Sequence, residues 1–169
     1  MDTRLRDPPG SYLLVIRTET PLELAVGRLG RRTFPRGWHV YAGSALGGLR
    51  RRLKHHLDAE RPVHWHVDVL RQAGRVSAVW VVQGPERREC ALARAVAALP
   101  GARLCPGFGS SDCHCPGHLV SFARAPRLAG LWPGLVRLPL GALESESARG
   151  VLPGPRLTTA GANRSLQRC

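Results

Sequence analysis

Residues 38–57 constrain the fold of this 169-residue chain more than any other stretch. They begin as a short strand around Val40, continue through a turn of small residues over 43–48, and end in a basic helix. An apolar residue recurs every four positions of that helix, at Leu49, Leu53 and Leu57. This spacing gives the helix a single apolar stripe, so the sequence predicts a strand–turn–helix unit with one buried helix face.

The other positions of this helix are basic, namely Arg50, Arg51, Arg52, Lys54, His55 and His56. Arg52 and His56 are four residues apart on one face and could contact one phosphate together. We expect the others, Arg50, Arg51, Lys54 and His55, to surround that contact and bind DNA. The formal charge of +13 also favours a polyanionic partner, nucleic acid before a membrane. Because a GC-rich coding sequence would also favour arginine, the cluster at 50–56 is stronger evidence than the total charge.

Short apolar runs bounded by turn residues predict the remaining strands, at residues 10–17, 22–26, 76–82 and 119–122. The first of these runs is dense enough in apolar residues to lie in the middle of a sheet. Helical patterns cover residues 62–70 and 86–99. The run at 22–26, followed by the turn signal at 27–30, is interpreted as a hairpin partner, and residues 31–37 are interpreted as a basic loop. The sequence therefore predicts an α/β fold with a small mixed or antiparallel sheet flanked by helices.

The same patterns divide the chain into three parts. Residues 1–9 are expected to form a disordered lead-in, and residues 10–125 a single domain. Residues 126–169 hold 5 Pro and 6 Gly among 44 residues without a periodic apolar face, so we expect a largely disordered tail. The sequence has no run of eighteen apolar residues and no signal-peptide pattern, so we expect a cytoplasmic protein without a membrane partner.

Two tyrosine motifs, Gly10-Ser11-Tyr12 and Tyr41-Ala42-Gly43, precede the helix that bears Arg52, and a later helix carries Glu89. This arrangement resembles the GIY-YIG nuclease superfamily. A closer resemblance is to its small uncharacterised bacterial and archaeal subfamily, some of whose members are attached to endonuclease III. The closer resemblance rests on four sequence segments, at residues 40–45, 64–70, 89–93 and 108–119. The two tyrosine motifs are further apart than is usual in the superfamily, which implies an inserted hairpin at residues 18–37.

The resemblance implies a metal-dependent endonuclease that hydrolyses DNA phosphodiesters, with DNA and a DNA-repair protein as partners. Glu89 would be the metal ligand, and a carboxylate suits Mg²⁺ or Mn²⁺. Arg52 would stabilise the charge that develops on the phosphate. Tyr41, and less directly Tyr12, would position or deprotonate the attacking water. His56 would be a second phosphate contact or a proton carrier.

Two further expectations follow from the resemblance. A phenol has an ordinary pKa of about 10, so a base role for either tyrosine requires Arg52 or the metal to lower that value. Many members of the superfamily carry a late asparagine in the active site. The only asparagine here is Asn163, in the expected tail, so Asp112 or His118 is expected in its place.

Each of these residues also has a structural interpretation. Tyr12 and Tyr41 could be amphipathic strand residues with a satisfied hydroxyl. Arg52 could be solvated on the helix surface, and Glu89 could stabilise the first turn of a helix. Asp68 fits a helix cap as well as a catalytic role. The alternative function that follows is a catalytically inactive nucleic-acid-binding module of the same fold.

The five cysteines, an odd number, fit reduced thiols or a metal site better than a secreted disulfide framework. Cys113, Cys115 and His118 lie in a loop rich in glycine and serine, and with Cys90 or Cys105 they could bind Zn²⁺. Their spacing is not that of a standard zinc finger and buried free cysteines are common, so zinc is a less favoured cofactor than Mg²⁺ or Mn²⁺. A structural zinc-binding interaction domain is the third function that the sequence leaves open.

Overall fold

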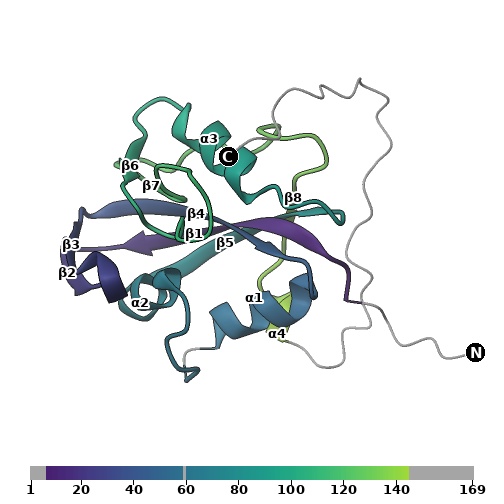
Figure 1. Ribbon diagram of the computed structural model, residues 1–169, viewed down its shortest axis with the longest axis horizontal. Coiled ribbons are helices and arrows are strands. Elements are labelled where there is room, and N and C mark those ends of the chain that lie inside the picture. Colours follow the sequence, from purple (N-terminus) through teal and green to yellow (C-terminus); the bar gives the residue numbers. More distant parts are fainter. Residues whose placement is uncertain (1–6, 59, 145–169) are drawn as a thin grey trace, which may run out of the picture.

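The computed structural model describes residues 7–58 and 60–144, and its centre is a six-stranded sheet (Figure 1). The strands of this sheet are β1 (Gly10–Thr18), β4 (Gly37–Ala45), β5 (Arg75–Gln83), β6 (Arg103–Cys105), β7 (Leu119–Phe122) and β8 (Val136–Leu138). Their order is β6-β7-β4-β1-β5-β8, so the dense apolar run of β1 lies between two long neighbours. Every pairing in the sheet is antiparallel, which confirms the predicted fold class.

Helices cover both faces of the sheet. They are α1 (Leu49–Leu57), α2 (His66–Ala73), α3 (Glu89–Ala97) and the short α4 (Gly141–Glu144). In Figure 1, α1, α2 and α4 lie on one side of the sheet and α3 lies on the other. Along β1, Tyr12 and Leu14 join the core that α1 and α2 cover, whereas Leu13 and Val15 join the core that α3 covers. Among the described residues, no helix has the length and hydrophobicity needed to cross a membrane.

The inserted hairpin is present as β2 (Leu22–Ala25) and β3 (Arg31–Phe34), joined through the short 3-10 helix η1 (Gly27–Leu29). The prediction of a basic loop over 31–37 is wrong for its first half, because β3 pairs with β2 in register. The side chain of Phe34 explains the order of these residues. It is buried in the core, with its ring centroid 6.0 Å from that of Phe108.

The helix predicted over 62–70 begins only at His66. The residue before it, Trp65, occupies the N-cap, and the carboxylate of Asp68 in the first turn accepts a hydrogen bond from the Trp65 backbone N–H at 2.9 Å. The residues from Pro62 to Trp65 therefore form an irregular approach to the cap rather than the first turn of the helix.

Residues 126–144 are part of the fold, so the predicted disorder of the tail is wrong for this segment. Leu128 and Leu135 are buried in the α3 core, and Leu138 and Leu143 are buried in the core on the other side of the sheet. Between them, β8 pairs with β5 at an edge of the sheet. The apolar residues follow no regular period because the segment crosses the sheet as an irregular chain with one three-residue strand. The rest of the predicted tail, 145–169, lies outside the described residues.

The predicted lead-in is ordered where the structure describes it. The Asp7 carboxylate accepts hydrogen bonds from the backbone N–H groups of Arg50 at 2.6 Å and Arg51 at 2.8 Å. It thereby caps α1, whose own N-cap residue, Gly48, has no side chain that could do so. Positions 1–6 of the lead-in lie outside the described residues.

Candidate active site

The two tyrosines of the sequence motifs lie on neighbouring strands and on the same face of the sheet. In the register of β1 and β4, Tyr12 pairs with Gly43 and Leu14 pairs with Tyr41, and the two tyrosine ring centroids are 6.3 Å apart. A side chain at Gly43 would not fit, since its Cβ would lie 2.5 Å from the Tyr12 phenol oxygen. The glycine of the second motif therefore makes room for the tyrosine of the first.

Tyr12, His56 and Asp68 form a buried chain of hydrogen bonds. The Tyr12 hydroxyl lies 2.7 Å from His56 Nε2, and His56 Nδ1 lies 2.8 Å from Asp68 Oδ1. Tyr12 retains 1 % of its accessible surface, and the other two residues retain none. The tyrosine comes from β1, the histidine from the buried side of α1, and the aspartate from the first turn of α2.

The protonation states of His56 and Asp68 determine which group donates and which accepts in each of these hydrogen bonds. Burial lowers the pKa of His56, although its hydrogen bond to Asp68 acts the other way. Burial alone would raise the pKa of Asp68, but hydrogen bonds from His56 and from two backbone N–H groups outweigh it and hold that pKa below its usual range. A neutral imidazole then donates its Nδ1 proton to the carboxylate, and its Nε2 accepts the proton of the Tyr12 hydroxyl. The hydrogen bonds therefore run from phenol to imidazole to carboxylate.

Asp68 is both a helix cap and the partner of His56. Its Oδ2 accepts hydrogen bonds from the backbone N–H groups of His64 at 3.0 Å and Trp65 at 2.9 Å, and Nε2 of His55 lies 3.3 Å away. A buried carboxylate with this many donors is stable in its ionised form. The structural and the catalytic interpretations of Asp68 are therefore compatible.

Arg52 lies between the Tyr12–His56–Asp68 hydrogen-bond chain and a basic cavity. Its guanidinium carbon lies 4.1 Å from the centroid of the Trp65 ring, and its Nη1 donates to the Ser44 carbonyl at 3.3 Å. The cavity has a volume of about 680 Å³, and its charged or titratable lining consists of Arg51, Arg52, Lys54, His55, Asp58 and Arg61. The single carboxylate among them is paired with Arg61 at 3.3 Å. The excess of cations makes this cavity suited to an anion.

The structure corrects the predicted position of His56. The sequence predicts it on the exposed face of the helix beside Arg52, whereas its side chain is fully buried and bonded to Tyr12 and Asp68. The buried stripe of α1 is therefore wider than its leucines indicate. Among the residues predicted to bind DNA, Arg51, Lys54 and His55 line the cavity, and Arg50 lies outside the lining.

Burial keeps both phenols protonated. Burial, followed by the charge of Tyr41, raises the pKa of Tyr12 well above 10, and the charge and hydrogen bond of Arg52 offset only part of this. Burial also raises the pKa of Tyr41 to about 12, again against the effect of Arg52. Arg52 thus acts in the expected direction but is outweighed by burial. A base role for Tyr12 therefore depends on His56, which can accept its proton.

Glu89 begins α3, on the opposite side of the sheet from α1. Its carboxylate accepts a hydrogen bond from the Ser44 hydroxyl and pairs with Arg87 at 3.1 Å. Ser44 connects the two sides of the sheet, since its carbonyl accepts from Arg52 while its hydroxyl donates to Glu89. The charge of Glu89 also contributes to the raised pKa of Tyr41. Glu89 is thus linked to Arg52 through Ser44 and to Tyr41 through its charge.

Ser11 and Ser44 are site residues that sequence reasoning missed. Their hydroxyl oxygens lie 2.7 Å apart, and Ser11 Oγ accepts a hydrogen bond from the Arg88 backbone N–H at 2.9 Å. The two serines therefore hold the start of α3, and Glu89 with it, against β1 and β4. Their positions in the sequence could have identified them as site residues, since Ser11 is the middle residue of the first tyrosine motif and Ser44 directly follows the second.

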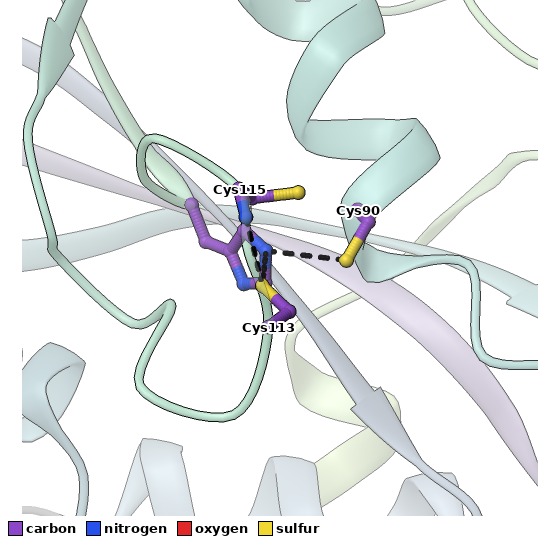
Figure 2. Close-up of side chains that lie close together, drawn as sticks. Cys90, Cys113 and Cys115 are labelled. Atoms are coloured by element: carbon purple, nitrogen blue, oxygen red, sulfur yellow. Dashed lines mark hydrogen bonds between the residues drawn. The ribbon is translucent and has the colours of Figure 1, made fainter. Parts of the chain in front are cut away.

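A second cluster lies beside α3 and consists of Cys90, Cys113, Cys115 and His118 (Figure 2). Its ligand atoms all lie within 4.8 Å of one another, so the cluster could bind a metal ion. Cys90, rather than Cys105, joins the loop residues. Three sulfurs and an imidazole suit Zn²⁺ better than Mg²⁺ or Mn²⁺, which prefer oxygen. Of the two residues expected in place of the late asparagine, His118 belongs to this cluster and Asp112 is exposed.

The fold and the site together define an antiparallel α/β domain with a buried phenol–imidazole–carboxylate chain beside a basic cavity. Residues 11–132 match the family described as Domain of unknown function DUF123, and the chain belongs to that family. The matched region includes Tyr12, His56, Asp68 and Glu89 as well as the cysteine cluster. Neither the curated proteins nor the solved structures include a significant match.

Proposed function

We propose that this protein is a GIY-YIG-like, metal-dependent endonuclease that hydrolyses DNA phosphodiesters, with DNA repair as its setting. The observation that carries the proposal is the buried hydrogen-bonded chain Tyr12–His56–Asp68, whose tyrosine interacts with Arg52, a residue that lines a basic cavity. A hydroxyl, an imidazole and a carboxylate in this order are the parts of a proton relay. An arginine next to the hydroxyl supplies a group that binds phosphate and stabilises its charge.

The cavity supports a nucleic acid as the substrate. Its cationic lining would contact backbone phosphates, which supply most of the affinity in protein–DNA complexes. Its volume of about 680 Å³ is typical of a small-ligand site, so it would accept a segment of one strand rather than a whole duplex. This geometry favours cleavage where the duplex is opened, nicked or branched.

In the proposed reaction Tyr12 moves a proton without needing a low pKa. As the attacking water gives a proton to the phenol oxygen, the phenol gives its own proton to His56 Nε2. The water oxygen forms the new bond to phosphorus, the bond to the leaving oxygen breaks, and that oxygen takes a proton from solvent. Asp68 holds the imidazole in the accepting tautomer and stabilises the imidazolium that forms. Tyr41 would position the water, and Arg52 would stabilise the phosphate charge.

Glu89 fits a metal site built on one carboxylate. Its side chain is 12 % exposed, and its present partners are Ser44 and Arg87. Mg²⁺ commonly keeps several waters and takes one or two carboxylates together with substrate oxygens, a requirement that a lone glutamate can meet. Bound there, Mg²⁺ or Mn²⁺ would neutralise charge on the phosphate. On binding the ion, the Glu89 carboxylate would release Arg87.

The second candidate function is a catalytically inactive DNA-binding module, and one observation favours it. Tyr12 and Tyr41 retain only 1 % and 7 % of their accessible surface, so little of either hydroxyl faces a substrate. In that case the Tyr12–His56–Asp68 chain stabilises the core, and the cavity alone binds phosphate.

A cleavage assay separates the two functions. Wild type, Arg52→Ala, Glu89→Gln and the control Arg36→Ala are incubated with labelled plain, nicked and branched duplex DNA and Mg²⁺ or Mn²⁺. Arg36 is exposed and outside the cavity lining, so its replacement removes the same charge elsewhere. We expect the wild type and the control to cleave, and Arg52→Ala and Glu89→Gln to be slower by at least about 100-fold. Binding without cleavage by wild type would favour the inactive module, and cleavage that survives Glu89→Gln would reject the metal assignment.

A further inference from the structure

We propose that Cys90, Cys113, Cys115 and His118 bind one structural Zn²⁺ ion. Cys90 lies in the first turn of α3, and the other three lie on the loop between β6 and β7 (Figure 2). This loop has no regular secondary structure, and Phe108 is its main apolar anchor. An ion held between the loop and α3 would fix this irregular loop against the helix.

The distances fit tetrahedral coordination. His118 Nε2 lies 3.6 Å from Cys90 Sγ and 3.4 Å from Cys113 Sγ. Zinc bonds of about 2.3 Å to sulfur and about 2.0–2.1 Å to nitrogen, at the tetrahedral angle, place the two ligand atoms about 3.6 Å apart. The two nitrogen–sulfur distances therefore match those of ligands that share one ion.

The surroundings of the cluster orient these ligands. The ring of His118 hydrogen-bonds to the Gly109 backbone, which leaves Nε2 facing the sulfurs. The Cys115 backbone N–H donates to Cys113 Sγ at 3.4 Å, which holds that sulfur in place within the loop. Arg94, whose Nε donates to the Cys90 carbonyl at 3.3 Å, brings positive charge to a site that would carry three thiolates.

Cys115 is disulfide-bonded in the structure, and a disulfide sulfur cannot act as a thiolate ligand. We therefore assign the zinc-bound state to the reduced protein. A phosphine reductant and one water convert the disulfide into two thiols, and the phosphine becomes its oxide. The Cys115 thiol then loses its proton to solvent as it binds zinc. Cys90 and Cys113 are already free cysteines.

The zinc site does not depend on the proposed nuclease activity. Glu89 directly precedes Cys90, so zinc would fix the helix turn from which Glu89 contacts Ser44. Loss of zinc would loosen the start of α3 whether or not the protein cleaves DNA.

Zinc content is the direct test. The full chain is expressed without added zinc, purified with a phosphine reductant, and its metal measured by plasma mass spectrometry against protein concentration. We expect about one zinc per chain in wild type and in the control Cys105→Ser, and loss of most of it in Cys113→Ser. Cys105 is the matched control because it is a free cysteine outside the cluster. Substoichiometric zinc in wild type, or full zinc in Cys113→Ser, would overturn the site.

Cobalt binding by the wild type tests the ligands even if a variant fails to fold. Metal-free, reduced wild type is titrated with Co²⁺ and its absorption spectrum recorded. We expect sulfur-to-cobalt charge-transfer bands and the visible bands of tetrahedral Co²⁺, both abolished by added Zn²⁺. A spectrum of octahedral Co²⁺ without sulfur bands would reject the proposal.

Discussion

Three histidines, His39, His56 and His118, are buried, and burial lowers the pKa of each. Each ring has polar partners that suit its neutral form. His39 is the simplest of them, since its Nε2 lies 3.0 Å from the Thr18 hydroxyl and its Nδ1 lies 2.8 Å from the Ser121 hydroxyl. At the scale of single residues, these rings make the stability of the protein depend on pH.

We predict that the free energy of unfolding falls as the pH drops below about 6.5. Burial lowers the pKa of His39 to about 4, so the unfolded chain binds a proton between these two values that the folded chain does not. His39→Gln should reduce the slope of stability against pH by up to about 1.4 kcal/mol per pH unit in this window. Urea unfolding of both proteins between pH 7 and pH 5 measures the difference. Equal slopes would contradict the account.

The residues of the site could be predicted from the sequence only in part. Tyr12, Arg52 and His56 were recognisable from the motifs that surround them. The partnership of His56 with Asp68 was not, because the two residues are 12 apart on different helices whose packing is set by the core. The packing of these helices on the core also buries His56, although the basic residues around it in the sequence indicate a solvent-facing position.

At the scale of elements, the segment after β7 is as much a part of the core as the strands before it. It contributes β8 and α4, and Leu138 pairs with Val79 across the edge of the sheet. We predict that Leu138→Ala lowers the free energy of unfolding by about 2–5 kcal/mol, because Leu138 is 2 % exposed.

The matched control is Leu46→Ala, at a position that is 46 % exposed, which should change stability by no more than about 0.5 kcal/mol. Chemical denaturation of the two variants gives the comparison. An effect of Leu138→Ala as small as that of Leu46→Ala would show that this segment does not belong to the folded domain.

Helices and strands with a clear apolar pattern in the sequence could be predicted, and the shortest strands could not. The apolar run of β1 and the leucine spacing of α1 determine those elements locally, and both form where the sequence predicts them. β3 and β8 have only four and three residues, so their structure depends on a partner strand rather than on a pattern of their own. Composition alone therefore gave the wrong prediction for residues 126–144.

At the scale of the whole molecule, the sheet separates two sites. The Tyr12–His56–Asp68 chain and the basic cavity lie on the side of α1, and the cysteine cluster lies on the side of α3. Ser44 bonds to Arg52 on the first side and to Glu89 on the second, so this residue links the two sides.

We predict that the cavity, and not the basic surface in general, binds the phosphates of DNA. Arg51→Gln should reduce the slope of the logarithm of the DNA association constant against the logarithm of salt concentration by about 1, as expected for one lost phosphate contact. Arg36→Gln removes an exposed arginine outside the cavity and should leave the slope unchanged. Fluorescence anisotropy over a range of salt concentrations measures both. Equal slopes for the two variants would place the DNA elsewhere.

The most direct test of the proposed function is the single-turnover rate at which Tyr12→Phe cleaves DNA with Mg²⁺, compared with wild type. The substitution keeps the buried ring and removes only the hydroxyl that donates to His56. The proposed relay predicts a rate at least about 100-fold lower, with DNA affinity unchanged. Cleavage by Tyr12→Phe at the wild-type rate would contradict it.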